Sequence, residues 1–408
     1  MHSAAQRTAI AGRILTGSMD LEKGLLAIDD GRIVYAGPEE GYADQALTEI
    51  HRLDEGEAVL PGLIDLHCHG GFGADFPAAD ETAARRGIDF LHRSGTTTLL
   101  ASLVTAPKDD LLRAISSFAS LAAEELVAGI HLEGPFLSAD RCGAQDPQWI
   151  RHPDLGLADD LISAGGGTIR TMTYAPELPG APELVDLLIS RNVLPSLGHT
   201  DADAATASAS LLRVSERLAG IDPGRTGTVT HLFNGMPPMH HRSPGPVLPC
   251  LQAAKGGTTV LELVADNTHL DPHVVSAVFD LIGADNIALV TDSMAAAGLA
   301  DGTYTLGPAT VQVQDQVARL KPAGSIAGGT ATMLDVLQRT ITAGVAPGEA
   351  VRAATATPAR VLGLSDDVGD LRRGMRADLI IVDSDFKLRL AMRRGSWLER
   401  LSTKASAG

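Results

Sequence analysis

The sequence predicts a (β/α)8 barrel of the TIM type, joined to a small β-sandwich domain that both ends of the chain build together. Strand-like and helix-like patterns alternate for about 300 residues in the middle of the chain, which indicates a parallel βα architecture. Several strand-like runs end on a histidine or an acidic residue, as is typical of an active site at the C-terminal end of such a barrel. Short strand-like runs and turn signals occupy both ends of the chain rather than one.

The expected β-domain is discontinuous and comprises residues 1–61 and 366–408. Its first part carries β-branched and apolar runs with a turn signal at Asp29-Asp30-Gly31. At the other end, residues 377–383 and 388–397 are each expected to form a strand.

The catalytic barrel is expected over residues 62–365, with residues 330–344 and 349–362 as its closing helices. Its first strand is expected over 63–69, at the end of the run PGLIDLHCHGG. Because side chains alternate along a strand, His67 and His69 should project from the same face. Two adjacent imidazoles can form part of a transition-metal site, although two histidines on a surface strand can show the same spacing by chance.

Four further strand-like runs each end on a side chain that can bind a metal. The run LVAGIHLE ends on Glu133, VLPSLGH on His199, TVTH on His231 and IALVTD on Asp292. A single histidine in such a position is more often a hydrogen-bonded core residue. Five strand ends of this kind in one chain favour a metal site at the carboxyl ends of the barrel strands.

Composition limits the classes of function. The 408 residues suffice for a barrel plus an accessory domain, and a mean hydropathy of +0.09 describes an ordinary globular chain. The net charge of −17 argues against nonspecific binding to nucleic acid or to anionic membranes, and an anionic ligand would need a local basic pocket. Three scattered cysteines, no apolar stretch of membrane-span length and no signal-peptide pattern predict a cytoplasmic protein.

In chain order, the blocks PGLIDLHCHG, HLEGPF, LGHTDA, THLFNGM and VTDSM resemble the amidohydrolase superfamily and, within it, the N-acetylglucosamine-6-phosphate deacetylase family. The resemblance extends from about Thr8 to Gly395, and the HLEGPF and THLFNGM blocks are specific to the deacetylases. It implies hydrolysis of N-acetyl-D-glucosamine 6-phosphate to D-glucosamine 6-phosphate and acetate, in amino-sugar catabolism and cell-wall recycling. It also implies the discontinuous β-domain and a homodimer.

The resemblance further implies one or two divalent transition-metal ions per subunit, with zinc as the first choice and iron, manganese or cobalt as alternatives. The expected metal ligands are His67, His69, Glu133, His199, His231 and Asp292. Glu133 would bridge two ions, and Asp292 would serve as general base and acid for a metal-bound hydroxide that attacks the amide. A plainer interpretation of Asp292, as the N-cap of the following helix, stays open.

The substrate contacts implied by the resemblance are Asn234, Gly235, Arg242, His269, Ala144 and Ile326. Arg242 lies in the loop MPPMHHRSPGP and matches a phosphate-binding arginine that, in the family, reaches across the dimer interface. The alternative is a solvated loop charge. Asn234 and Gly235 match a clamp on the same phosphate.

The chain departs from the family's usual pattern at several positions. Gln145 stands where histidine is common, Asn267 where glycine is common and Gly329 where serine is frequent. None of the three is expected to touch the metal ligands, so they should affect affinity and selectivity rather than reaction type. Residues 213–225 lengthen the connection before His231.

Two alternatives to this function remain. The nearer one is another amidohydrolase activity on the same fold, such as deacylation of a related N-acyl hexosamine phosphate or of an N-acyl amino acid. The other is a non-catalytic barrel kept as an interaction scaffold, which is disfavoured because such proteins usually lose metal ligands.

Overall fold

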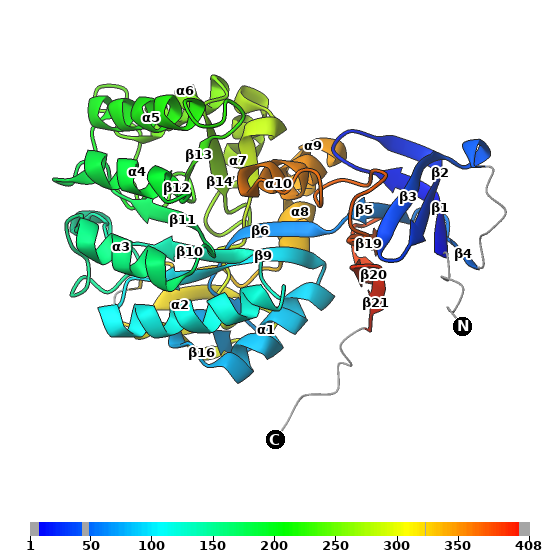
Figure 1. Ribbon diagram of the computed structural model, residues 1–408, viewed down its shortest axis with the longest axis horizontal. Coiled ribbons are helices and arrows are strands. Elements are labelled where there is room, and N and C mark those ends of the chain that lie inside the picture. The colour runs from blue at the N-terminus through cyan, green and yellow to red at the C-terminus, as the bar shows by residue number, and fades with distance from the viewer. Residues whose placement is uncertain (1–7, 43–48, 323, 400–408) are drawn as a thin grey trace.

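A barrel and a separate sheet domain make up the protein. The computed structural model describes residues 8–42, 49–322 and 324–399. One eight-stranded sheet is parallel throughout, and helices surround it; the other eight-stranded sheet lies beside it and contains strands from both ends of the chain (Figure 1). This arrangement confirms the predicted fold class.

The barrel strands follow one another in chain order, and each pairs in parallel with the next. They are β6 (Leu63–Cys68), β9 (Thr96–Val104), β10 (Gly129–Glu133), β11 (Ile169–Tyr174), β12 (Leu194–Leu197), β13 (Gly227–Val229), β14 (Thr259–Leu263) and β15 (Ile287–Leu289). Nearly all of their residues are buried, because helices cover one face and side chains fill the interior. This explains why the strands appear in the sequence as continuous apolar runs.

Helices surround the barrel, and several of them begin at a side chain that caps the first turn. They are α1 (Glu81–Arg93), α2 (Lys108–Ala123), α3 (Leu155–Ala164), α4 (Ala181–Ser190), α5 (Ala204–Ala219), α6 (Val247–Lys255), α7 (Pro272–Ile282), α8 (Met333–Thr342), α9 (Pro347–Ala354) and α10 (Ala356–Leu362). The side chains of Asp80, Asp154 and Asp203 each accept a backbone N–H in the first turn of α1, α3 and α5. Such a cap stabilises a helix by about 1 kcal/mol.

The barrel closes between its last and first strands through a seam of backbone hydrogen bonds. The N–H of Asp292 donates to the carbonyl of His67 at 2.9 Å, and the N–H of His69 donates to the carbonyl of Ser293 at 2.7 Å. The seam lies just beyond β15, at the carboxyl ends of both strands. It therefore fixes the positions of His67, His69 and Asp292 relative to one another.

A buried carboxylate reinforces this seam. Asp65 is 1% exposed and accepts hydrogen bonds from Thr291 Oγ1 at 2.6 Å and from the N–H of His67 at 3.2 Å. Burial raises the pKa of Asp65 to about 6, although these hydrogen bonds oppose the shift. The pair ties β6 to the end of β15 inside the barrel.

The β-domain joins strands from the two ends of the chain. They are β1 (Thr8–Leu15), β2 (Asp20–Asp29), β3 (Arg32–Pro38), β4 (Glu49–Arg52), β5 (Ala58–Pro61), β19 (Leu379–Val382), β20 (Leu388–Arg393) and β21 (Ser396–Leu398). Strand β5 pairs with β1 on one side and with β19 on the other. Alternate residues of β1, β2 and β19, among them Ile10, Leu26 and Ile381, pack into one buried cluster.

Two sequence-based expectations about elements need correction, and one further sheet is an addition to them. Residues 388–397 form the hairpin β20–β21 rather than one strand, because Arg394 and Gly395 adopt positive φ angles of 53° and 76° and turn the chain. The expected helix over 349–362 is interrupted at Thr355, which has φ −139° and ψ −75°. An antiparallel sheet of β16 (Gly302–Leu306), β17 (Ala309–Gln314) and β18 (Val317–Leu320), inserted between β15 and α8, was not predicted.

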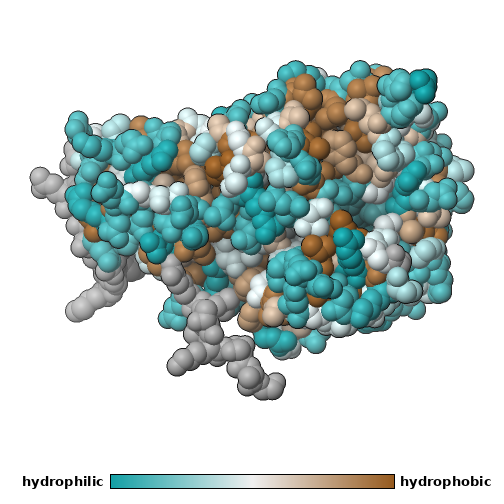
Figure 2. Space-filling model, turned by 180° about the vertical axis from the view of Figure 1, so that it is seen from behind, coloured by the Kyte–Doolittle hydropathy of each residue, from teal (hydrophilic) through white to brown (hydrophobic). Residues whose placement is uncertain are grey.

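The short strands β7 (Gly70–Gly71) and β8 (Ala74–Asp75) follow β6 directly. The exact domain boundaries stay a prediction, and residues 1–7, 43–48 and 400–408 lie outside the described residues. Seen from behind, the surface is mostly hydrophilic, with apolar side chains gathered over the barrel (Figure 2). Among the residues that the structure describes, no helix is both long and apolar enough to cross a membrane.

Candidate metal centre and active site

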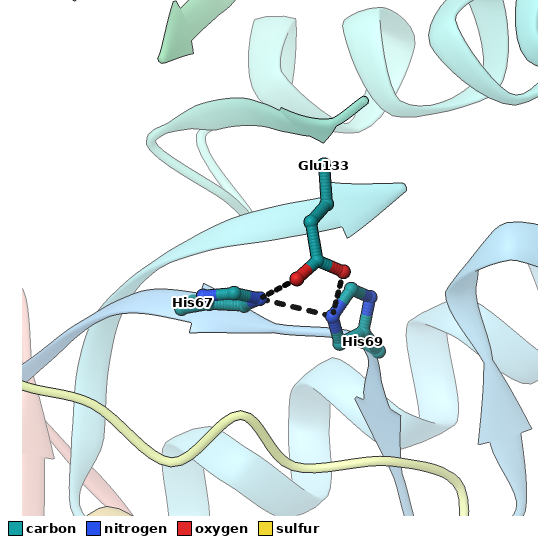
Figure 3. A group of neighbouring side chains, drawn as sticks. All are labelled: His67, His69 and Glu133. Atoms are coloured by element: carbon teal, nitrogen blue, oxygen red, sulfur yellow. Dashed lines mark hydrogen bonds and ion pairs between the residues drawn. The ribbon is translucent and has the colours of Figure 1, made fainter. Parts of the chain in front are cut away.

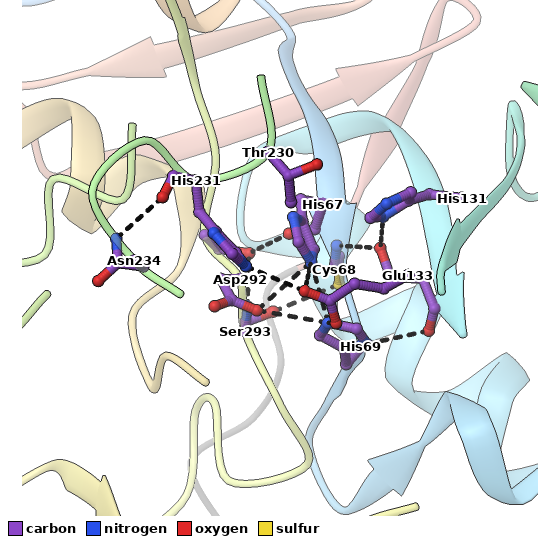
Figure 4. Close-up of polar contacts among 12 residues, drawn as sticks. His67, Cys68, His69, His131, Glu133, Thr230, His231, Asn234, Asp292 and Ser293 are labelled. Atoms are coloured by element: carbon purple, nitrogen blue, oxygen red, sulfur yellow. Dashed lines mark hydrogen bonds and ion pairs between the residues drawn. The ribbon is translucent and has the colours of Figure 1, made fainter. Parts of the chain in front are cut away.

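All the expected metal ligands meet at the carboxyl ends of the barrel strands. They are His67, His69, Glu133, His199, His231 and Asp292, each at or just after the end of β6, β10, β12, β13 or β15. Their exposed fractions range from 0% for His67 to 9% for Asp292. Figure 4 shows five of them pointing toward one centre, with Glu133 in the middle.

The carboxylate of Glu133 connects two groups of histidines. Its Oε1 lies 2.9 Å from Nε2 of His199 and 3.0 Å from Nε2 of His231. Its Oε2 lies 3.2 Å from Nε2 of His69, and Oε1 is also 3.6 Å from Nε2 of His67 (Figure 3). One oxygen thus faces His199 and His231, while the pair of oxygens spans the His67–His69 side.

The partners of the Nδ1 atoms determine where the imidazole lone pairs point. Nδ1 of His67 faces Oε2 of Glu262 at 3.2 Å, and Nδ1 of His69 faces the carbonyl of Ser102 at 3.2 Å. Nδ1 of His199 faces the carbonyl of Arg141 at 2.8 Å. Since each of these partners accepts a hydrogen bond, the neutral imidazole carries its proton on Nδ1 and directs the Nε2 lone pair into the centre.

These lone pairs make the centre suitable for cations. Nε2 of His67 lies only 3.0 Å from Nε2 of His69, and Nε2 of His199 lies 3.1 Å from Nε2 of His231. Two lone pairs at this distance repel each other unless a proton or a metal ion lies between them. The ligand atoms form two groups, His67–His69–Glu133 and Glu133–His199–His231, in each of which all atoms lie within 4.8 Å of one another. Imidazole nitrogen and carboxylate oxygen suit a divalent first-row metal.

Charges in the centre also affect its ionisation. When a proton rather than a metal ion lies between the imidazoles, burial lowers the pKa of His69, but Asp292 and Glu133 outweigh burial and raise it to about 10. Burial raises the pKa of Asp292. The charges of His67 and His69 nevertheless hold this pKa well below the ordinary range. Asp292 is therefore ionised at neutral pH. Its Oδ1 lies 3.3 Å from Nε2 of His69 and 3.5 Å from Nε2 of His67.

Gln145 is a residue of this centre that sequence reasoning assigned wrongly. It was expected not to touch the metal ligands, but its Nε2 donates a hydrogen bond to Oε2 of Glu133 at 2.5 Å. Its side-chain oxygen accepts the N–H of Thr105 at 2.7 Å, and the residue is 4% exposed. Gly329 also touches the set, because its N–H donates to the carbonyl of Asp292 at 2.6 Å.

Two further buried residues support the histidines. Glu262, which is 2% exposed, faces Nδ1 of His67 and also accepts the backbone N–H of His231 at 3.2 Å. The ring of His131 packs edge-on against His67 at 4.5 Å between centroids (Figure 4). A carboxylate inside the otherwise apolar run TVLEL was the sequence signal for Glu262, and it was not used.

A pocket of about 210 Å³ opens above the centre. Besides metal-centre residues, its lining includes five of the expected substrate contacts, namely Ala144, Asn234, Gly235, His269 and Ile326. Gly235 has a positive φ of 61°, and a Cβ there would lie 3.0 Å from Nδ1 of His199, so the close approach needs glycine. Asn234 Nδ2 donates to the carbonyl of His231 at 3.2 Å.

Arg242 is placed differently from the other expected contacts. It is exposed, it does not line the pocket, and its Nη1 lies 2.9 Å from Nε2 of His241. Asn267 adopts a positive φ of 61° at the position where glycine is common. Its neighbour His269 donates from Nδ1 to Oδ2 of Asp266 at 2.8 Å, which leaves Nε2 directed toward Asp292, 3.9 Å away.

Fold and site together define a barrel with a histidine–carboxylate metal centre, the class of the metal-dependent hydrolases. The amidohydrolase family model matches residues 58–398, most of the chain. The chain belongs to the amidohydrolase family.

Several similar proteins of this family are named as deacetylases of an N-acetylhexosamine 6-phosphate. The N-acetylglucosamine-6-phosphate deacetylase of Bacillus subtilis (strain 168) is 34% identical over 398 residues, which cover 94% of each chain. The N-acetylgalactosamine-6-phosphate deacetylase of Escherichia coli O157:H7 is 33% identical, over 92% of this chain and 94% of its own. A solved structure of a mutant N-acetyl-D-glucosamine-6-phosphate deacetylase from Mycobacterium smegmatis, in complex with N-acetyl-D-glucosamine-6-phosphate, is 36% identical with a TM-score of 0.87. The match covers 97% of this chain and all of that one.

Proposed function

We propose that this enzyme hydrolyses the acetamide of N-acetyl-D-glucosamine 6-phosphate to D-glucosamine 6-phosphate and acetate. The observation that carries the proposal is the convergence of Glu133 with four histidine Nε2 atoms at the floor of a pocket. Relatives named as deacetylases of this sugar phosphate match nearly the whole chain and support the choice of substrate. The reaction belongs to amino-sugar catabolism, and the cytoplasm stays the expected location.

The proposed metal ligands divide into two sets that share Glu133. His199 and His231 would hold one divalent ion with Oε1, and His67, His69 and Asp292 would hold a second on the Oε2 side. Zinc is the first candidate, with iron, manganese or cobalt as alternatives. A bound ion would polarise the amide carbonyl and lower the pKa of a water molecule beside it.

Asp292 is the proposed proton carrier of the reaction. It is ionised at neutral pH, lies beside His67 and His69, and lines the pocket above the centre. Its carboxylate can take a proton from the attacking water and deliver it to the amine nitrogen as the C–N bond breaks. His269, whose Nε2 faces Oδ2 of Asp292 at 3.9 Å, orients this carboxylate or contacts the acetyl group.

The sugar phosphate is proposed to lie between the loops around Ala144, Asn234 and Ile326, which line the pocket. Asn234 and Gly235 would bind the phosphate from within the subunit. Arg242 would reach the same phosphate in a neighbouring subunit of a homodimer, which agrees with its exposed position outside its own pocket. The −17 charge of the chain makes such a local positive group necessary.

A second candidate substrate is N-acetyl-D-galactosamine 6-phosphate. The observation in its favour is the 33% identity to a deacetylase of that name, close to the 34% found for the glucosamine enzyme. The two sugars differ only in the configuration of one hydroxyl group. The loops over the pocket would have to distinguish the two positions of this hydroxyl group.

The test is a deacetylation assay with both N-acetylhexosamine 6-phosphates and both unphosphorylated sugars, with metal analysis of the same sample. The proposal predicts the highest kcat/KM for N-acetyl-D-glucosamine 6-phosphate. A higher value for the galactosamine compound would favour the second candidate. Equal values with and without phosphate would rule out both.

A further inference from the structure

A second cavity, of about 260 Å³, lies where the barrel meets the β-domain. On the barrel side it is lined by Thr97 and Arg170, each the second residue of its strand, β9 and β11. On the other side it is lined by Arg393 and Arg394, at the end of β20. These are the amino ends of the barrel strands, opposite the carboxyl ends that carry the metal centre (Figure 1). The cavity is therefore distinct from the candidate active site.

Positive side chains dominate the lining of this cavity. Its arginines are Arg32, Arg170, Arg376, Arg393 and Arg394. Only Glu125 and Asp367 among its lining residues are acidic. In a chain with a net charge of −17, this concentration of guanidinium groups is local and opposite to the overall field.

Three of these arginines are paired with carboxylates. Arg32 lies 2.5 Å from Asp367, and Arg394 lies 2.5 Å from Glu125. Arg376 pairs with Asp378, next to the cavity, and also approaches Asp367 at 3.5 Å. The three carboxylates of this region thus form ion pairs with three arginines, and the negative charges balance the positive ones.

The other two arginines have no carboxylate partner among the described residues. Arg170 donates from Nε to the carbonyl of Ala128 at 3.1 Å, which leaves its outer N–H groups free. Arg393 donates only to the carbonyls of Thr97 and Glu125. Burial lowers the pKa of Arg393 to about 10; the charge of Asp378 opposes this shift, and the charges of Arg376 and Arg394 add to it. Within the described residues, neither of these two guanidinium groups forms an ion pair with a carboxylate.

A buried donor beside them also lacks an acceptor. Nε of Arg394 is shielded from solvent and has no hydrogen-bond partner within the described part of the chain. Buried polar groups are almost always hydrogen-bonded, and an exception often marks the place of an ion or water molecule. This donor is a second sign, independent of the charge count, that the cavity is built for an acceptor.

We propose that this cavity binds a phosphate-sized dianion, either free phosphate or the phosphate of a small phosphomonoester, held by Arg170 and Arg393. Two unpaired guanidinium groups match the charge of a dianion, and their N–H forks suit phosphate oxygens. The cavity is smaller than the roughly 300–1,000 Å³ typical of pockets for drug-sized ligands, which favours a small anion. Because the two arginines come from different domains, the anion would fasten the β-domain to the barrel.

Calorimetric titration with inorganic phosphate at constant ionic strength tests the proposal. The titrations use the full-length enzyme carrying Arg242→Ala, which removes the arginine proposed for the substrate's phosphate. We expect this protein to bind phosphate, and Arg170→Met in the same background to weaken binding by about tenfold or more. Arg170→Lys should recover part of the affinity. The matched control is Arg213→Met, which removes an arginine of α5 that is paired with Asp186 of α4.

The results separate the proposal from its alternatives. It is overturned if the Arg242→Ala protein binds no phosphate, or if Arg170→Met binds it as tightly as the Arg213→Met control. Arg393→Met adds a second variant, although Arg393 also joins the two domains through backbone carbonyls and its loss could reduce stability. Competition by glucosamine 6-phosphate would support the proposal with a phosphomonoester as ligand, and phosphate binding without competition would support it with free phosphate. Neither result depends on deacetylase activity.

Discussion

The side-chain amide of Gln145 holds one oxygen of Glu133 in place. Its Nε2 donates to Oε2 of the carboxylate at 2.5 Å, while its oxygen accepts the N–H of Thr105 at 2.7 Å. The second hydrogen bond fixes which end of the amide faces Glu133. The carboxylate plane is thereby set so that Oε1 faces His199 and His231 and Oε2 faces His69.

Gln145→Met should lower the affinity for the divalent metal. The substitution keeps the volume of the side chain but removes the donor, and losing a partner that orients a metal ligand typically costs about 10- to 100-fold in metal affinity. A competition titration against a chelator measures the change. Gln148→Met, three residues further on and exposed, is the control and should leave the affinity unaltered. An unaltered affinity in Gln145→Met as well would mean that Glu133 is held by the histidines alone.

Substitution of the histidines should separate the two proposed metal sites. His199→Ala or His231→Ala removes a ligand on the Oε1 side and should abolish nearly all turnover together with one bound ion. His67→Ala should weaken the other site selectively, because His69 and Asp292 remain there. Elemental analysis of the purified variants gives the metal-to-protein ratio. Equal metal content in all three variants and the wild-type protein would refute the assignment of ligands.

Asp292→Asn should reduce turnover by about 10²- to 10⁴-fold, because the amide cannot take a proton from water. Because Asp292 is also a proposed metal ligand, any loss of bound metal adds to this decrease. Fold and KM should change little, and circular dichroism and steady-state kinetics check both. Turnover near the wild-type value in a variant that retains its metal would remove Asp292 from the reaction.

Arg242→Ala should reduce kcat/KM for the phosphorylated substrate far more than for the unphosphorylated sugar. One charge-assisted contact contributes roughly 1.5–3 kcal/mol, so the ratio of the two specificity constants should fall by about 10- to 150-fold. Arg242→Lys should restore only part of it, because an ammonium group lacks the planar fork. An unchanged ratio would exclude Arg242 from the phosphate site.

Mixing subunits tests whether Arg242 serves the neighbouring subunit. A mixed dimer of Arg242→Ala and Asp292→Asn subunits would contain one pocket with an intact Asp292 and an arginine from its partner. Activity should therefore return when the two inactive proteins exchange subunits. No recovery, with exchange confirmed by differently tagged subunits, would place the arginine in the pocket of its own chain.

Thr291→Val should destabilise the barrel without any direct contact to substrate. The substitution leaves Oδ2 of the buried Asp65 without its 2.6 Å donor, and an unsatisfied buried group costs about 1–3 kcal/mol. Urea unfolding measures the loss. Thr303→Val on the exposed part of β16 is the control and should stay within about 0.5 kcal/mol of the wild-type protein. Equal stability of the two variants would show that the carboxyl group of Asp65 finds another partner.

The sequence predicted those parts of the structure that follow from periodicity. His67 and His69 alternate along one strand, and the other expected ligands end apolar runs, so a barrel must bring them to one end. Gln145 could not be found in this way, because its contact depends on the path of the irregular connection between β10 and α3. The sheet β16–β18 was not predicted, because its strands, such as ATVQVQ, lie between the last expected barrel strand and the first closing helix, where the sequence indicated no element.

The seam that closes the barrel has a consequence for the order of events during synthesis. Asp65 and Thr291 are 226 positions apart. The first barrel strand, β6, therefore cannot pair with the end of the last strand, β15, until most of the chain has been synthesised. Strand β5 pairs even later, because its partner β19 lies near the other end of the sequence. An incomplete chain leaving the ribosome would thus display the unpaired edges of β5 and β6, and closing such distant contacts is slow. Chaperone dependence during translation, rather than after it, is what this connectivity predicts.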